Sequence, residues 1–378
     1  MDRPQISLII PTINEAENLP ALAARIDSAL SGRRYEILVV DDNSKDDTVD
    51  VCVALARKYP FRLITRTVPK DGLGGAVLCG LKQCAGEYLV VMDADLQHPP
   101  ERLTALLEPL EKQEADFVLG SRNVEGGSTF ARWSLFRQIN SAIATWLARP
   151  FTGKITDPMS GFFAMHRKTY ERAERLTPLG YKIGLELMCK CRVKRVREIP
   201  IHFAQREHGH SKLSVREQFR YLEHLSRLYD FCFPRLSPVA KFTFVVGLSW
   251  LVGAAICKSL LLGQIYLPVA VTIAYAGVVL TEAIFHRRYI RTQRDFLLSK
   301  HPWIEFAVVA GIEWSVCVAV AFWTHHRVSS PRAAEVLVLS FGAATVARYV
   351  LRKELMQDIR GLRREIRRDE LMHPGEHQ

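Results

Sequence analysis

Short apolar runs alternate with longer amphipathic stretches along the first 125 residues. The apolar runs, each read as a strand, cover residues 6–10, 35–40, 61–65, 88–92 and 117–120. The stretches between them, each read as a helix, cover residues 15–30, 48–58, 74–84 and 100–113. Because the strands are continuously apolar, they are expected to be buried on both faces. The pattern predicts a Rossmann-like, mostly parallel α/β sheet with helices on both faces.

Local signals refine the first helix and the sheet edge. Asn14 and Glu17 have capping-box spacing, which predicts a helix that opens near residue 15.

The strand ends are followed by Pro11, by Asp41 and Asp42, and by Asp93 and Asp95. Ligands of such sheets bind beyond the carboxyl ends of the strands. Several acidic strand ends at one edge therefore predict a binding site there.

The sequence VVMDADLQHPPE places two carboxylates, Asp93 and Asp95, directly after an apolar strand. Like charges this close favour a divalent cation, and Gln97 adds a neutral oxygen. These hard donors suit Mg²⁺ or Mn²⁺, with diphosphate oxygens completing the shell. The alternative is a solvated turn.

Asp42 suits ribose hydroxyls or a base edge, and helix capping through residues 42–44 is its alternative.

Other candidate sites are weaker. The glycine-rich stretch at residues 70–75 follows the third strand, and residue 77 is valine, so it is read as a loop before a helix and not as a dinucleotide fingerprint. Arg122 and Arg137 fit oxyanion contacts or an ordinary surface position about equally. The histidines at 202, 208 and 210 lack further ligands at zinc spacing, so the pattern disfavours zinc.

The second part of the chain is apolar. Residues 211–233 form an amphipathic pattern in which Val215, Phe219, Leu222 and Leu225 are expected to share a face, either interfacial or core-facing. Four apolar stretches follow at 239–262, 266–285, 303–323 and 335–351. Each has about the 20 residues that cross a bilayer. Buried core helices remain the alternative for the last two, which contain charged residues.

Charge supports a membrane domain and argues against nucleic-acid binding. Residues 1–233 carry 33 Lys or Arg and 29 Asp or Glu (+4), and residues 234–378 carry 18 and 11 (+7), so the positive excess lies in the apolar part. Residues 264–267 carry no Lys or Arg, whereas residues 286–302 carry five. This alternation predicts a multi-pass protein of the cell membrane with its middle loop, both termini and catalytic domain in the cytosol. The eight scattered cysteines are read as reduced thiols.

Several motifs together resemble one family. IIPTINEAENL, VVDDNSKDDT, VVMDADLQHPPE, GSR, DPMSGFFAM and REHGHSKL resemble dolichol-phosphate mannose synthases, family-2 glycosyltransferases with the GT-A fold. The apolar tail resembles a GtrA-like four-helix domain. The resemblance implies a GT-A domain over 1–210, interface helices over 211–235, a transmembrane domain over 236–352 and a basic cytosolic tail over 353–378. Ile13 departs from the pattern, because the family often has an aromatic residue there.

The resemblance also implies a reaction: inverting transfer of mannose from GDP-mannose to dolichyl or another polyprenyl phosphate. Alternatives are transfer of glucose or an N-acetylhexosamine from a UDP-sugar, and a lipid-linked-sugar carrier with a degenerate transferase domain. By motif, the residues implied to bind the nucleotide-sugar are Pro11, Ile13, Glu15, Val40, Asp42, Asp93, Ala94, Asp95, Gln97, Arg206 and Lys212. Those implied to bind the acceptor phosphate are Arg122, Arg137 and Ser141. The lipid bilayer is an implied partner, and the oligomeric state is left open.

Overall fold

The fold was obtained as a computed structural model. It describes residues 3–69, 71–129, 135–174, 176–177, 179, 182–204, 215–285, 302–327, 332–348 and 350, without the side chains of 135–141, 215–217 and 302–305. The chain divides into two compact units, unit 1 (Met1–Pro234) and unit 2 (Arg235–Gln378). Each unit is described by itself.

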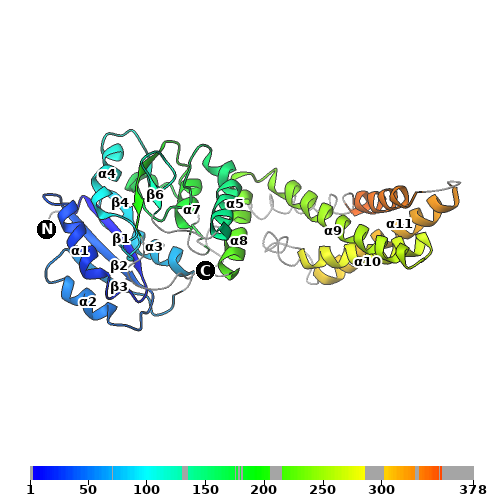
Figure 1. The fold of residues 1–378 in the computed structure, drawn as a ribbon, viewed down its shortest axis with the longest axis horizontal. Helices are drawn as coiled ribbons and strands as arrows, with labels where there is room; N and C mark the ends of the chain where they lie inside the picture. The colour runs from blue at the N-terminus through cyan, green and yellow to red at the C-terminus, as the bar shows by residue number, and fades with distance from the viewer. Residues whose placement is uncertain are drawn as a thin grey trace, which may run out of the picture. The chain divides into compact units, whose positions relative to one another are not determined.

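Unit 1 is built on one mixed sheet (Figure 1). Its strands are, in spatial order, β3 (Phe61–Thr65), β2 (Tyr35–Asp41), β1 (Ile6–Thr12), β4 (Tyr88–Val91), β7 (Phe163–His166), β5 (Phe117–Ser121) and β8 (Val196–Pro200). Only β7 runs antiparallel to its neighbours in this sheet. Two short strands, β6 (Ser128–Thr129) and β9 (His202–Phe203), form a separate parallel pair. The mostly parallel sheet is confirmed.

Helices cover both faces of the sheet because successive strand residues point to opposite sides. In β1, Leu8 packs with Ile6 and Ile10 on one face, while Ile9 packs on the other. The first face is covered by α1 (Leu19–Ala29), α2 (Thr48–Leu55) and α4 (Leu103–Glu111), which follows the 3-10 turn η1 (Pro100–Arg102). The second is covered by α3 (Gly72–Gln83), α5 (Leu135–Thr152), α7 (Ile183–Lys190) and α8 (Val215–Cys232). The short α6 (Arg167–Tyr170) follows β7.

The predicted capping box at the first helix is wrong. Asn14 has φ of 56°, in the left-handed region that asparagine tolerates. Its side-chain Oδ1 accepts a hydrogen bond from the backbone N–H of Lys45 at 2.7 Å. Asn14 therefore ties the β1 loop to the β2 loop, and α1 begins later, at Leu19, with Asn18 at the N-cap.

The predicted amphipathic helix is α8, but its expected common face is divided between core and solvent, and the side chain of Val215 lies outside the described residues. Phe219 and Leu222 are 53% and 41% exposed, whereas Leu225 and Leu228 are buried in the sheet-facing core. Six residues turn an α-helix by about 600°, so Leu225 lies roughly 120° from Phe219. The helix thus carries one apolar face toward the core and a second apolar patch toward solvent.

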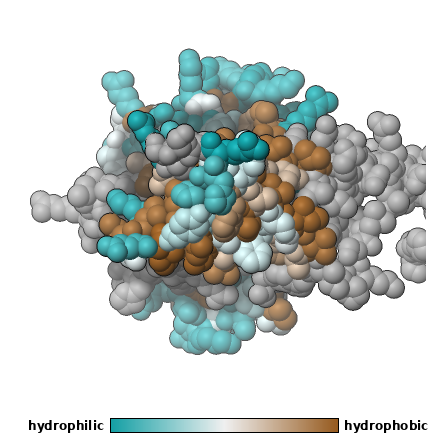
Figure 2. Space-filling view, turned by 90° about the vertical axis from the view of Figure 1, so that its right-hand side faces the viewer, coloured by the Kyte–Doolittle hydropathy of each residue, from teal (hydrophilic) through white to brown (hydrophobic). Residues whose placement is uncertain are grey.

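Unit 2 is helical. Its elements are α9 (Ser237–Leu262), α10 (Leu267–Phe285), α11 (Pro302–Arg327) and the helical residues 333–348. Three segments are long and apolar enough to cross a bilayer, namely Ser237–Leu262, Leu267–Phe285 and Phe306–Arg327. These match three of the four expected spans, and the fourth stays a prediction. Outward-facing residues are mostly apolar, such as Leu251 and Leu280 at 70% and 64% exposure, and apolar patches are visible in Figure 2.

Candidate active site

The carboxyl ends of β2, β1 and β4 lie side by side at one edge of the sheet. Thr12 pairs with Asp41, and the backbone N–H of Asp42 donates to the carbonyl of Thr12 at 2.9 Å. On the other side of β1, the N–H of Met92 donates to the carbonyl of Ile9 at 3.2 Å. The residues after these strands therefore meet at the same edge, as the sequence predicted.

Residues expected to line the nucleotide occupy the β1 and β2 ends. Pro11 and Val40 are register partners and both are buried. Ile13, just past β1, is 39% exposed. The N–H of Glu15 donates to Oγ1 of Thr48 at 3.0 Å. The structure thus gathers these positions in one place and leaves Ile13 as an accessible apolar surface.

Asp41 and Asp42 have different environments. Asp41 accepts a hydrogen bond from the N–H of Ser44 at 3.1 Å, so it stabilises the loop after β2. Asp42 is 8% exposed and forms an ion pair with Arg66 in which Nη1 and Oδ1 are 2.8 Å apart. Burial raises the pKa of the Asp42 carboxyl, although Arg66 opposes that shift. Asp41 is therefore held by the loop that follows β2, whereas Asp42 is held by the cationic side chain of Arg66.

Asp93 and Asp95 are fixed by short-range hydrogen bonds. The N–H of Asp93 donates to Nδ1 of His98 at 3.1 Å. Oδ1 of Asp95 accepts from the N–H of Gln97 at 3.2 Å, and between them Leu96 adopts φ of 62°. Asp95 is 5% exposed, whereas the Asp93 side chain is 34% exposed.

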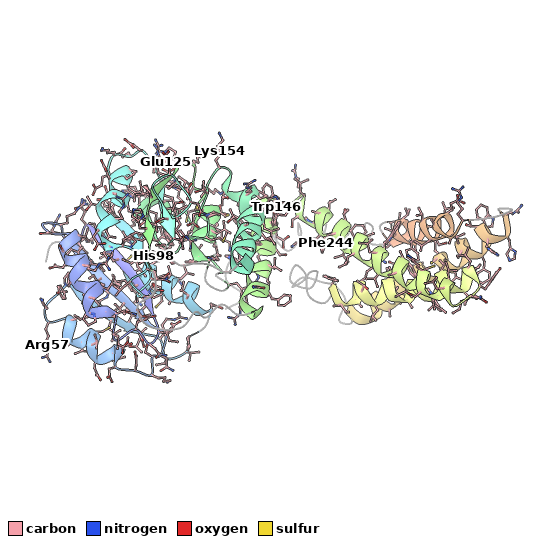
Figure 3. All side chains as sticks on the ribbon, viewed as in Figure 1. Arg57, His98, Glu125, Trp146, Lys154 and Phe244 are labelled. Atoms are coloured by element: carbon pink, nitrogen blue, oxygen red, sulfur yellow. The ribbon has the colours of Figure 1, made fainter. Side chains whose placement is uncertain are left out.

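His98, which is labelled in Figure 3, packs this turn against the core. Its ring is 3% exposed and lies 5.3 Å from the ring of Phe162 and 5.4 Å from that of Phe203, centroid to centroid. Gln97 is anchored from the other side, since its Nε2 donates to the carbonyl of Ala204 at 3.1 Å. The buried Ala94 completes the turn. The carboxylates therefore sit on a rigid segment.

The antiparallel strand β7 brings a second segment to the same edge. Phe163, its first residue, pairs with Val91, the last residue of β4. The residues just before β7 therefore lie beside Asp93. A Cβ at Gly161 would lie 3.2 Å from Oδ2 of Asp93. Glycine at this position keeps space open next to the carboxylate.

Arg122, which follows β5, is held by Asp157 from this segment. Nε and Nη2 each donate to one carboxylate oxygen at 2.7 Å, and the guanidinium carbon lies 5.1 Å from the centre of the Phe203 ring. Glu198 on β8 accepts from the N–H of Asp157 at 3.0 Å. Asp157 and Glu198 thus fix the direction of Arg122. The sequence prediction for Arg122 did not include this partner.

The remaining predicted residues are only partly described. Arg137 and Ser141 lie on α5, but their side chains are outside the described residues, as are Arg206 and Lys212 entirely. The hydroxyls of Tyr221 and Tyr229 on α8 donate to α5 carbonyls at 2.7 and 3.1 Å. Trp146 on α5 is 65% exposed (Figure 3). The helix carrying Arg137 and Ser141 is therefore anchored to α8.

The donors at Asp93 and Asp95 fit a divalent cation shared with a ligand. Within the described ranges, no group of three or more His, Cys, Asp or Glu side chains could hold a metal ion. Two carboxylates are too few for a complete protein shell, but Mg²⁺ commonly binds through one or two carboxylates together with substrate phosphates. The space that Gly161 leaves beside Asp93 is consistent with such shared coordination.

Replacing Asp157 with asparagine should weaken the β5–β8 region. Breaking a buried ion pair by removing one partner costs about 3 kcal/mol, and the Asp157 side chain is 1% exposed. Burial raises the pKa of Asp157, but the hydrogen bonds from Arg122 outweigh it and lower the pKa overall. A lowered pKa stabilises the fold above the unfolded value of about 3.9, and this stabilisation is lost on acidification. Amide hydrogen exchange of β5 and β8 measures both effects.

Asp116→Asn is the matched control. Asp116 lies at the other end of β5 and pairs with Arg195 at 3.0 Å, but the Arg195 side chain is 57% exposed. This substitution should change the free energy of local opening by less than about 1 kcal/mol. If the amides of β5 and β8 were equally protected from hydrogen exchange in wild type and Asp157→Asn, with the same pH dependence below about pH 4, Asp157 would not stabilise this region.

Comparisons with known sequences agree on one family. Residues 7–173 match the model of glycosyl transferase family 2. A dolichol-phosphate mannosyltransferase of Pyrococcus furiosus is 44% identical over 248 residues, covering 65% of this chain and 69% of the relative. Proteins of the same name from Mycosarcoma maydis and Saccharomyces cerevisiae are 40% and 38% identical, covering 61% and 64% of this chain and 81% and 92% of the relatives.

Among solved structures, the chain is similar to glucosyl-3-phosphoglycerate synthase of Mycobacterium tuberculosis. The complex with phosphoglyceric acid is 22% identical with a TM-score of 0.47, covering 61% of this chain and 80% of that one. The complex with Mn²⁺, uridine diphosphate and glucosyl-3-phosphoglycerate is 20% identical with a TM-score of 0.47 and the same coverage.

Proposed function

Because this chain belongs to the dolichol-phosphate mannosyltransferases of glycosyl transferase family 2, we propose that it transfers mannose from GDP-mannose to dolichyl or a related polyprenyl phosphate. The observation that carries the proposal is the 38–44% identity to three relatives of that name over 240–251 residues. The paired carboxylates at the sheet edge supply the chemistry that such a transfer requires.

The donor nucleotide-sugar is proposed to bind over the ends of β1, β2 and β4. Asp42 recognises the nucleoside, and the exposed Ile13 offers an apolar contact to the base. Asp93, Asp95 and Gln97 face the diphosphate and would hold Mg²⁺ or Mn²⁺. When bound, that ion supplies positive charge to stabilise the leaving diphosphate. Arg206 and Lys212 are proposed to contact the same diphosphate.

The acceptor phosphate is proposed to bind on the β5 side of the edge, at Arg122, Arg137 and Ser141. Its attacking oxygen is already anionic at neutral pH, so the reaction needs positioning more than a strong general base. Asp157 supports this positioning by holding Arg122 in one orientation. Attack opposite the leaving diphosphate inverts the anomeric centre and gives a β-linked product.

A transfer assay with a panel of donors tests the function. The purified full-length protein, in detergent with dolichyl phosphate, is given labelled GDP-mannose, UDP-glucose and UDP-N-acetylglucosamine in parallel. We expect label in the lipid phase from GDP-mannose, dependent on Mg²⁺ or Mn²⁺ and absent without the lipid phosphate. A higher kcat/KM with either UDP-sugar would reassign the donor, and no metal-dependent transfer from any donor would overturn the enzyme assignment.

Arg137→Lys should separate acceptor from donor binding. A guanidinium holds a phosphate through two parallel hydrogen bonds, which an ammonium cannot reproduce. The substitution should raise the apparent KM for lipid phosphate and lower kcat, with donor affinity nearly unchanged. Calorimetry of GDP with metal checks the last point in Arg137→Ala. A loss of nucleotide affinity above tenfold, about 1.4 kcal/mol, would place Arg137 in the donor site instead.

Unit 2 is proposed to be a GtrA-like membrane domain with four spans and both termini in the cytosol. The three apolar helices and the charge alternation between the loops support this topology. Cysteines introduced at Gln264 and Ser329 should react with an impermeant thiol reagent on intact cells. A cysteine at Gln293 should react only after permeabilisation, with the unsubstituted protein giving the background. External labelling at Gln293 would refute the proposed orientation.

A further inference from the structure

A cluster of ionisable side chains is buried inside unit 2. It consists of Glu282 on α10, Glu313 on α11 and Arg348 in the helical residues 333–348. They are 5%, 2% and 2% exposed, respectively. Glycosyl transfer at the sheet edge of unit 1 uses none of them, so their burial requires a separate explanation.

Arg348 lies at the centre of this cluster. Its Nε and Nη2 donate to the two oxygens of Glu313 at 2.6 and 2.5 Å, and its Nη1 donates to Oε1 of Glu282. The Tyr275 hydroxyl donates to Glu313 at 3.3 Å, and the Ser249 hydroxyl donates to Oε1 of Glu282 at 3.1 Å. Glu313 thus receives three donors over both oxygens. Both donors to Glu282 meet the same oxygen, Oε1.

The charges in the cluster do not balance. Two carboxylates and one guanidinium sum to −1 if all are ionised. Tyr275 and Cys317 are the other titratable groups that face it from α10 and α11, and both are ordinarily neutral near pH 7. Among the described residues, α9 contributes the Ser249 hydroxyl and no charge to these contacts. An uncompensated charge among apolar helices is strongly unfavourable.

A bound anion cannot supply the positive charge that would balance the cluster. A lipid phosphate would add negative charge and compete with two carboxylates for the same guanidinium. Glu313 already has a bidentate cationic partner and a hydroxyl donor, so both of its oxygens accept hydrogen bonds. Glu282 has a single cationic contact and an oxygen, Oε2, that no described hydrogen bond uses.

We propose that this cluster binds one exchangeable proton, carried by Glu282, so that it is neutral at neutral pH. When the proton leaves at higher pH, the cluster gains a negative charge and Glu282 and Glu313 repel each other across Arg348. The hydrogen bond between Ser249 and Glu282, which joins α9 to α10, is part of the same network. Protonation would therefore control how firmly these helices pack.

Charge balance predicts a proton count for each variant of the full-length protein in lipid vesicles. The wild type should contain one protonated carboxyl in the cluster, Glu282→Gln and Glu313→Gln none, and Arg348→Gln two. Infrared spectroscopy detects the carbonyl stretch of a protonated carboxyl apart from carboxylate bands. In the wild type, the band of the protonated carboxyl should disappear as pH rises. It should be absent from Glu282→Gln and from Glu313→Gln, and about twice as intense in Arg348→Gln.

A hydrophobic carbodiimide identifies which carboxyl carries the proton, because it reacts with protonated carboxyls in apolar surroundings. Peptide mass spectrometry should find the adduct on Glu282 of the wild type, decreasing as pH rises. An adduct on Glu313 would overturn the assignment to Glu282. A wild type without the infrared band, or a band that persists unchanged in Glu282→Gln, would overturn the proposal itself. Both results are independent of sugar transfer, so they leave the proposed activity untouched.

Discussion

Asp95→Asn is expected to abolish sugar transfer while leaving unit 1 folded. Asparagine keeps an Oδ1 acceptor for the N–H of Gln97, so the turn that contains Leu96 is preserved. It removes the negative charge that a divalent cation requires. Losing a metal ligand should cost several kcal/mol of transition-state stabilisation. We therefore expect kcat to fall at least about a hundredfold, roughly 2.7 kcal/mol.

The measurement is steady-state transfer from GDP-mannose with metal concentration varied. Asp50→Asn is the matched control, because it removes one carboxylate from the exposed surface of α2. It should leave kcat and metal dependence unchanged. Retention of more than a tenth of the wild-type kcat in Asp95→Asn, with normal metal dependence, would rule out a role for Asp95 in metal binding.

Arg348→Met is expected to destabilise unit 2 by about 3 to 5 kcal/mol, the range found when one partner of a buried ion pair is removed. Methionine keeps the apolar stem but leaves Glu282 and Glu313 without their shared donor. Thermal unfolding of the full chain in detergent, with hydrogen exchange of α10 and α11 to localise the effect, measures it. Arg327→Met, at an exposed position near the end of α11, is the control and should change little.

A compensating variant separates charge from packing. Replacing Glu282 and Glu313 with glutamine in the Arg348→Met background removes the unpaired acids. Because buried ion networks can be exchanged for neutral groups with little loss of stability, this triple variant should recover most of the lost stability. If Arg348→Met alone unfolds no earlier than wild type, the cluster does not stabilise unit 2.

The sheet was predictable where apolar runs are continuous and each is followed by a helix. β1 to β5 follow this pattern, and their positions agree with the structure within a few residues. β7 was not predicted. Its four residues, Phe163–His166, lie in a stretch of irregular pattern, and strand direction depends on pairing with β4 and β5. Such long-range pairing leaves no periodic signal in a single sequence.

The sequence predicted the carboxylates of the candidate site but not the residues that hold the site in place. Asp93 and Asp95 were identified because carboxylates at the end of a buried strand are unusual. Asp157 stood in the quoted motif DPMSGFFAM without an assigned role, because its partner Arg122 is 35 positions away. His98 was missed because the sequence does not show which group its ring contacts, and its partner is the backbone N–H of Asp93.

The reversed direction of β7 has a consequence for how this enzyme can change. If β7 ran parallel to β4, the segment that precedes it would lie at the opposite edge of the sheet. A strand of roughly four residues spans about 13 Å, so that segment would be about that far from the carboxyl end of β4. Reversal instead places residues 157–161 between the end of β4, the proposed donor side, and the end of β5, the proposed acceptor side. Each side is built by different loops on a common rigid support. Exchange of one loop set could therefore alter the lipid acceptor without redesign of the nucleotide pocket, and chimaeras divided at β7 are the natural place to try.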